Sequence, residues 1–327
     1  MIRVCLYYRG LPETDRWFLG DHLIRPLVRR IIRGKPRPGG IDRVLINLCL
    51  GLRRLAVSYE INLPFGRLRS DDRIGMIGRG RQVLEGYDRP NPIVAGVALT
   101  THPSEWPTLC EDYPIAAYLQ HSEWATDVYR PYYGDRCHIW PVGIDTDSWR
   151  PSQGVDKEFD FLIYDKIQWN RETIAASMLA AIRRELRARH LTWLEIRYGD
   201  YGERDYRRAL RACRAMIFLC EHESQGLAYQ ECLSSGVPIL AWDQGWCLDP
   251  NRFAWRQPHI PATSVPYFDD RCGLRFRRIE EFRDRLMEFI ELERSGGFCP
   301  RDYICENLTL EKCARHYVDI ANSVALC

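Results

Sequence analysis

Long apolar runs are absent from this chain of 327 residues. None approaches the roughly 20 residues that a membrane-spanning helix needs. The first ten residues, Met-Ile-Arg-Val-Cys-Leu-Tyr-Tyr-Arg-Gly, read as a strand and lack the layout of a signal peptide. With 46% apolar and 28% charged residues, the composition predicts a soluble globular protein, and the length is sufficient for two domains.

Paired cysteine motifs are also missing. The thirteen cysteines lie mostly inside apolar segments, without Cys-x-x-Cys pairs or a regular histidine spacing. This pattern argues against a structural zinc site and indicates buried thiols in a reducing compartment. We therefore expect a cytoplasmic protein.

Net charge is low, at +2, but it is unevenly distributed. Residues 1–70 carry fourteen Lys and Arg against five Asp and Glu, which predicts an anionic partner. No base-recognition motif accompanies the many aromatic residues, so nucleic acid is not the expected partner. Residues 25–37 suit either a basic amphipathic helix at the inner face of a membrane or a solvated basic loop.

The most informative stretch is residues 215–242. Its first six residues are apolar without helical spacing, which predicts a buried strand of a parallel sheet. A loop and a helix follow, and Gly236-Val-Pro238 ends the helix before the next apolar run. Glu223 falls in the loop at the carboxyl end of the first strand, and Glu231 falls about two helical turns later.

This arrangement predicts a particular kind of ligand. In an open α/β sheet, ligands bind outside the carboxyl ends of the strands, where a helix start presents unpaired N–H groups to anions. Gly226 lets the backbone approach such a ligand, and the two glutamates accept hydrogen bonds from hydroxyls. A phosphate surrounded by sugar hydroxyls satisfies all these groups, whereas the alternative is an ordinary strand, loop and helix with solvated acids.

Glu223 and Glu231, followed by Ser-Ser-Gly-Val-Pro, resemble the donor-site signature of retaining GT-B glycosyltransferases of family four. The resemblance implies an α/β protein with two Rossmann-like, doubly wound domains facing a central cleft. Residues 1–150 would form the acceptor-side domain and residues 151–308 the domain that binds the nucleotide sugar. A C-terminal helix in residues 309–327 would pack back toward the first domain.

The activity that this resemblance implies is transfer of a sugar from a nucleotide diphosphate sugar to an acceptor hydroxyl. The family retains the anomeric configuration and requires neither a metal nor a cofactor. The acceptor would be a glycan, a lipid-linked molecule or a small molecule. Two alternatives share the fold: a non-hydrolysing nucleotide-sugar epimerase and a non-catalytic nucleotide-sugar-binding protein.

The same resemblance implies which residues bind the diphosphate. Lys166 and Arg171 stand five apart after a predicted strand, where the family commonly has Arg first and Lys second. Backbone groups of Gly226 and Leu227 would also face the diphosphate. So would Gly40, which opens an amphipathic helix in an element that the family places across the cleft.

The two glutamates have different implied roles. Glu223 would hold a hydroxyl of the transferred sugar, and Glu231 would hold the ribose hydroxyls of the nucleotide. We therefore expect Glu223 to act in the reaction and Glu231 to bind the donor.

The family also tends to carry a histidine near the reacting sugar, after the fourth strand of the first domain, so the resemblance implies a catalytic histidine. We prefer His102, which follows a predicted strand at residues 92–100; His121, after a predicted strand at residues 114–119, is the alternative. Asp145 and Asp147 resemble a metal-binding Asp-x-Asp. Their place at the linker between the domains, and the lack of further ligands beside them, argue against a metal site.

Overall fold

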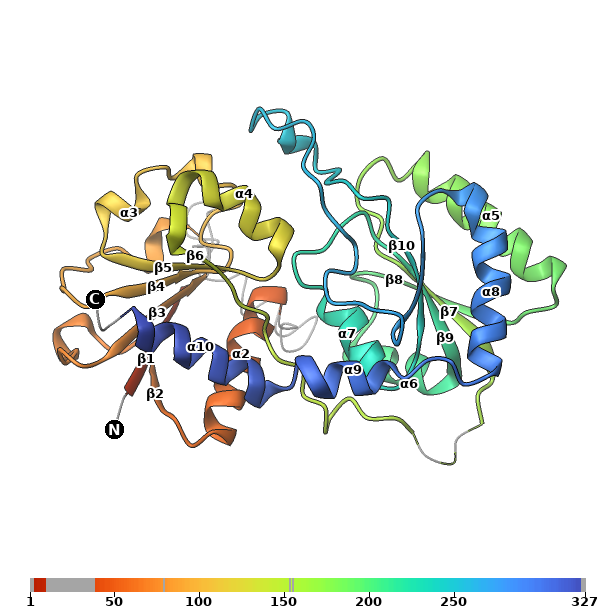
Figure 1. The fold of residues 1–327 in the computed structure, drawn as a ribbon, viewed down its shortest axis with the longest axis horizontal. Coiled ribbons are helices and arrows are strands. Elements are labelled where there is room, and N and C mark those ends of the chain that lie inside the picture. Colours follow the sequence, from red (N-terminus) through yellow and green to blue (C-terminus); the bar gives the residue numbers. More distant parts are fainter. Residues whose placement is uncertain (1–2, 10–38, 79, 153, 155, 325–327) are drawn as a thin grey trace, which may run out of the picture.

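The computed structural model describes residues 3–9, 39–78, 80–152, 154 and 156–324. The predicted membrane-contact segment, residues 25–37, lies outside the described residues. The described parts form two α/β units that lie side by side, each built on a parallel sheet (Figure 1). No helix in these parts combines the length and apolarity needed to cross a bilayer.

The first sheet has six strands in the order β2-β1-β3-β4-β5-β6. Its strands are β1 (Arg3–Arg9), β2 (Ser58–Ile61), β3 (Arg73–Gly78), β4 (Ile93–Gly96), β5 (Ile115–Gln120) and β6 (Cys137–Ile139). Helices α2 (Gly40–Arg54) and α10 (Leu310–Ser323) pack on one face, and α3 (Leu109–Asp112) and α4 (Glu123–Tyr133) pack on the other. With both faces covered, the inner strands are almost entirely buried, as is usual for parallel sheets.

The second sheet has five strands in the order β11-β10-β9-β7-β8. Its strands are β7 (Phe159–Asp165), β8 (Trp193–Arg197), β9 (Cys213–Leu219), β10 (Ile239–Trp242) and β11 (Gly273–Phe276). One face is covered by α6 (Glu203–Ala212), α7 (Leu227–Ser234) and α9 (Pro300–Asn307), and the other by α5 (Ile174–Ala188) and α8 (Phe282–Arg294).

Helix α2 forms because its apolar residues recur every three or four positions and face the first sheet. Asp42 in its first turn accepts a hydrogen bond from the backbone N–H of Gly39 at 2.6 Å. On the packed face, a Cβ at Gly51 would lie 2.5 Å from the carbonyl oxygen of Leu310, so glycine allows α10 to approach closely. The two helices together cover one side of the first unit.

The C-terminal helix α10 belongs to the core of the first unit, although it follows the second unit in the chain (Figure 1). Trp140 donates its indole N–H to the carbonyl of Cys313 at 2.9 Å, and Tyr317 packs edge-on against the same indole. The returning chain pairs with the outgoing one, because Ile144 N–H bonds to the carbonyl of Leu308 at 2.8 Å. The expected return of this helix to the first domain is thus confirmed.

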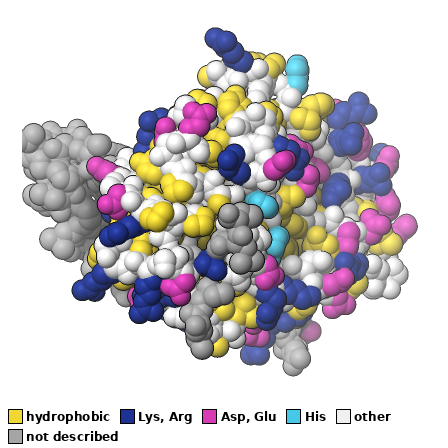
Figure 2. Space-filling view, turned by 60° about the vertical axis from the view of Figure 1, so that its left-hand side comes forward, with side chains coloured by type: hydrophobic (Ala, Val, Ile, Leu, Met, Phe, Trp, Pro, Cys, Tyr) yellow, Lys and Arg dark blue, Asp and Glu magenta, His cyan; other side chains and the backbone are white. Residues whose placement is uncertain are grey.

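Sequence patterns predicted most of these elements, with two notable differences. Strand β4 ends at Gly96 because that residue has a φ of +100° and Ala98 also has a positive φ, which breaks the extended conformation. Strand β11 lacks a predictive apolar run and is held by pairing with β10 from Ile239 onward. On the face in Figure 2, side chains of both charge signs are interspersed with apolar ones.

Candidate functional site

A cavity of about 580 Å³ lies between the two units, at the carboxyl ends of β7 and β9. Both units line it: the first contributes Gly39, Gly40, Ile41, Arg43, Val44 and His121, and the second contributes Trp149, Lys166, Tyr198, Gly199, Tyr201, Glu203, Tyr206, Glu223, Ser224, Gln225, Gly226, Leu227, Ala228 and Glu231. A smaller cavity of about 270 Å³, between β7, β9 and α8, contains none of the predicted site residues. The larger cavity is therefore the candidate site.

The loop after β9 turns sharply into α7 at Gly226. This residue has φ +82° and ψ 53°, the left-handed conformation, and directly precedes the helix. A Cβ there would lie 2.1 Å from the ring of Tyr229, so the turn leaves room for no side chain. The first N–H groups of α7, from Leu227 onward, have no partner within the helix and border the cavity, where an anion would fit.

Lys166 and Glu223 form an ion pair on the cavity wall, with side chains only 14% and 12% exposed. Burial alone would lower the pKa of Lys166, but the Glu223 carboxylate, together with neighbouring groups, raises it overall. The ammonium group also lies 4.6 Å from the ring centre of Tyr198. A fixed positive charge thus faces the cavity beside the start of α7.

The backbone of Glu223 is held from both units. Its N–H donates to the carbonyl of Thr263 at 2.9 Å, and its carbonyl accepts the indole N–H of Trp124, on α4, at 2.8 Å. Gln225 adds a second link, donating to the carbonyl of Val142 at 2.7 Å and accepting from its N–H at 2.8 Å. The loop that carries Glu223 is therefore positioned by contacts across the cleft.

Arg171 is placed differently from Lys166. Its guanidinium binds Asp165, with 3.0 Å between Nη1 and Oδ1, and it does not appear among the residues that line the cavity. The hydrogen bond that Arg171 donates to the carboxylate of Asp165 raises the pKa of Arg171. The structure thus brings Lys166, Glu223, Gly226, Leu227, Glu231 and Gly40 to one cavity and leaves Arg171 behind it.

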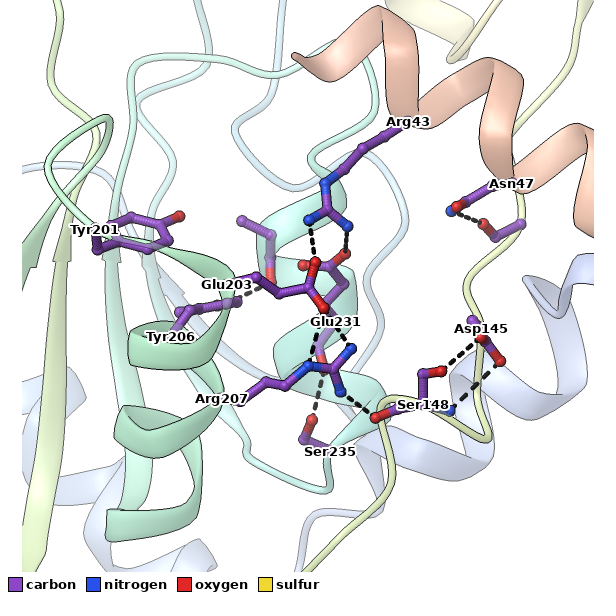
Figure 3. A network of polar contacts seen from close by, with 12 residues as sticks. Arg43, Asn47, Asp145, Ser148, Tyr201, Glu203, Tyr206, Arg207, Glu231 and Ser235 are labelled. Atoms are coloured by element: carbon purple, nitrogen blue, oxygen red, sulfur yellow. Dashed lines mark hydrogen bonds and ion pairs between the residues drawn. The ribbon is translucent and has the colours of Figure 1, made fainter. Parts of the chain in front are cut away.

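Glu231 lies on α7 with its side chain 9% exposed, and Arg43 reaches it from α2, with 3.3 Å between Nη1 and Oε1 (Figure 3). Sequence reasoning missed Arg43. The signal was its position three residues after Gly40, on the same face of a helix whose start was already placed at the cleft. Glu203 and Trp149 were also missed, because the start of α6 and the linker between the units bring them to the cavity.

Burial raises the pKa of Glu231 to about 8, although Arg43 acts to lower it. Between pH 4.5, the usual carboxyl value, and pH 8, the folded protein keeps a proton that the unfolded chain has released. Stability should therefore fall as pH rises through this window. We expect wild type to lose on the order of 2–4 kcal/mol relative to Glu231→Gln between pH 5 and pH 8.

Urea unfolding of both proteins at pH 5 and pH 8 measures this difference in stability. Glu195→Gln, which changes a glutamate on β8 away from the cavity, is the control for effects that any Glu→Gln change has on stability. Parallel pH profiles of wild type and Glu231→Gln would contradict the buried, protonated carboxyl.

The two candidate histidines occupy different places. His121 directly follows β5 and lines the cavity, whereas His102 stacks on Trp255 with 4.7 Å between ring centres and is not among the lining residues. Nδ1 of His121 lies 3.0 Å from the carbonyl oxygen of Trp140, which can only accept, so Nδ1 carries the proton and Nε2 is an acceptor. Burial lowers the pKa of His121 to about 4, which keeps the ring neutral.

Comparison of the sequence with models of protein families, and with characterised proteins, finds no match. The structure, in contrast, matches solved glycosyltransferase structures. AviGT4, a glycosyltransferase involved in avilamycin A biosynthesis, matches with a TM-score of 0.54 at 16% identity, covering 99% of this chain and 98% of AviGT4. The lipopolysaccharide outer core galactosyltransferase WaaB matches with a TM-score of 0.55 at 10% identity, covering 98% and 99%.

A third match is TarM from S. aureus, solved in complex with fondaparinux, alpha-GlcNAc-glycerol and UDP. Its TM-score is 0.53 at 11% identity, and the match covers 85% of this chain and 59% of TarM. At such identities the likeness is one of fold. Two parallel-sheet units that face a shared cavity, joined by a C-terminal helix that returns to the first unit, give this chain the GT-B fold that its sequence implied.

Proposed function

We propose that this protein is a glycosyltransferase that moves a sugar from a nucleotide diphosphate sugar to an acceptor hydroxyl, with retention and without a metal. The cavity between the units carries the proposal, because a cation, a helix start and two carboxyl groups line it together. The GT-B fold and the UDP bound to TarM support the same reading. On this proposal, residues 1–150 serve the acceptor, residues 151–308 bind the donor, and residues 309–327 return to the first domain.

Each group on the cavity wall has a proposed part in the reaction. Negative charge builds up on the departing diphosphate, so Lys166 and the backbone N–H groups of Gly226 and Leu227 stabilise it. Gly40 lines the opposite wall, where the space beside it is open, and faces the diphosphate from the first unit. Arg171 contributes indirectly, because its guanidinium pairs with Asp165 at the end of β7.

The carboxyl groups and the histidine are assigned to hydroxyls. Glu223 accepts a hydrogen bond from a hydroxyl of the transferred sugar. Lys166 pairs with both Glu223 and the diphosphate. Glu231 accepts hydrogen bonds from the ribose hydroxyls. His121, a neutral ring with an acceptor Nε2, is the better placed of the two histidines to contact the reacting sugar, because it lines the cavity.

A thermal-shift panel of nucleoside diphosphates and their sugars tests the donor site. We expect one base to raise the melting temperature, because a ligand that binds only the native state stabilises it by mass action. Glu231→Ala should weaken binding of that nucleotide by about tenfold, since the hydrogen bonds between its carboxyl group and the ribose hydroxyls are lost. Glu195→Ala, whose carboxylate pairs with Arg183 outside the cavity lining, is the matched control and should keep the full shift.

Turnover of the stabilising nucleotide sugar with an acceptor library then tests transfer. NMR of the product's anomeric proton tests retention, and activity in excess EDTA tests metal independence. An unchanged melting temperature with every nucleotide would refute the donor site. An altered nucleotide sugar formed without any acceptor would replace the transferase with an epimerase.

A further inference from the structure

Arg43 links the two units through one guanidinium group. It projects from the first turn of α2 and contacts two carboxyl groups of the second unit (Figure 3). Nη1 lies 3.3 Å from Oε1 of Glu231 on α7, and Nη2 lies 2.5 Å from Oε2 of Glu203 at the start of α6. All three residues line the 580 Å³ cavity, so these contacts span the space where a donor would bind.

The two carboxyl groups depend on Arg43 to different degrees. Glu203 has a side chain 44% exposed and receives two further hydrogen bonds from Arg207, at 3.0 Å from Nε and 2.8 Å from Nη2. Glu231 is 9% exposed, and Arg43 is the cation within ion-pair distance of its carboxyl group among the residues that the structure describes. If Arg43 moved away, Glu203 would still contact Arg207 and water. The buried carboxyl group of Glu231 would instead lose its contact with a cation. The Glu203 contact is the one that can be exchanged.

An anion of suitable geometry is the natural replacement for Glu203. Guanidinium binds phosphate oxygens with the same paired N–H groups that bind a carboxylate. The cavity wall that would receive such an anion also holds the ammonium of Lys166 and the start of α7. A phosphate that entered there would meet cations from both units.

We propose that Arg43 is a specificity-determining residue that selects diphosphates, and that the donor's diphosphate takes the place of Glu203 on its guanidinium while Glu231 stays in contact. This inference rests on the proposed function and adds a residue from the first unit to the donor site. In the empty protein Glu203 competes with the ligand for Arg43. Removing Arg43 and removing its competitor must therefore have opposite effects on affinity.

Calorimetric titration of Arg43→Gln and Glu203→Gln tests this competition. The ligands are UDP, GDP and ADP, the three matching nucleosides, and inorganic pyrophosphate. Arg43→Gln should lower the affinity for the nucleoside diphosphate that binds, and for pyrophosphate, by about tenfold or more. Glu203→Gln should tighten both by about threefold to tenfold, because the guanidinium is freed. Affinity for the nucleoside should change in neither variant.

Arg54→Gln is the matched control. Arg54 lies on the same helix and pairs with Asp145 at 2.7 Å and Glu311 at 3.1 Å, outside the cavity lining, so its loss should leave every affinity unchanged. Unfolding midpoints of all variants separate lost binding from lost folding.

Weaker or unchanged diphosphate binding by Glu203→Gln would overturn the proposal, as would unchanged binding by Arg43→Gln. Failure of the proposed function is a separate result. If wild type binds pyrophosphate with this variant pattern but no nucleotide, the donor-site function fails and the role of Arg43 stands. If wild type binds neither, both fail.

Discussion

Replacing Gly226 by alanine should lower the free energy of unfolding by about 2–4 kcal/mol and abolish nucleotide binding. The new Cβ would lie 2.1 Å from one ring carbon of Tyr229 and 2.4 Å from another. The ring cannot move aside easily, because Tyr229 is completely buried and its hydroxyl accepts the backbone N–H of Tyr267 at 3.0 Å. The start of α7 would have to shift away from the phosphate position.

Gly86→Ala separates this clash from backbone strain. Gly86 has a φ of +76°, close to that of Gly226, but no heavy atom lies within 4 Å of where its Cβ would be. That variant should lose only about 1 kcal/mol. Urea unfolding of both variants measures the difference, and calorimetry measures nucleotide affinity. Equal losses of stability in the two would show that the Tyr229 contact yields and that strain alone is responsible.

Replacing Lys166 by methionine should have the largest effect on activity. The variant leaves the 12% exposed carboxylate of Glu223 without its cation, which should cost about 3–5 kcal/mol of stability. It also removes a positive charge from the departing diphosphate, so the rate of sugar transfer should fall by about 10²-fold to 10³-fold. Unfolding and initial-rate measurements give the two effects separately.

The double variant Lys166→Met, Glu223→Gln distinguishes the structural role of Lys166 from its catalytic role. A neutral partner removes the unpaired buried charge, so most of the lost stability should return, while transfer stays below that of Glu223→Gln alone. Recovery of transfer together with stability would mean that Lys166 only supports the fold. Arg171→Met, which breaks the ion pair with Asp165 behind the cavity, should reduce transfer less than Lys166→Met does.

Local patterns were sufficient for the half of the site that lies on one continuous segment. The apolar run before Glu223, the glycine at the turn and the Gly-Val-Pro that ends the helix each act over a few residues. Strand, turn and helix therefore follow from neighbouring side chains. Glu223 lies in the loop before α7 and Glu231 on α7 itself, and both line the same cavity.

The histidines show where local patterns are insufficient. A predicted strand through residue 100 made His102 the natural candidate, but the positive φ values of Gly96 and Ala98 turn the chain away before that point. His102 then packs against Trp255, which is distant in sequence. His121 directly follows β5, and the position of β5 within the sheet places His121 at the cavity.

The sequence by itself determined the alternation of strands and helices, the strand, turn and helix around Gly226, and the two carboxyl groups of Glu223 and Glu231 near the carboxyl end of a strand. Only the tertiary structure decided which cation reaches Glu231, because Arg43 lies 188 residues earlier and meets it through packing of the two units. It also decided that Lys166 faces the cavity and Arg171 does not. Side-chain spacing along one element is set by backbone geometry, whereas contacts between units depend on how whole sheets and helices pack.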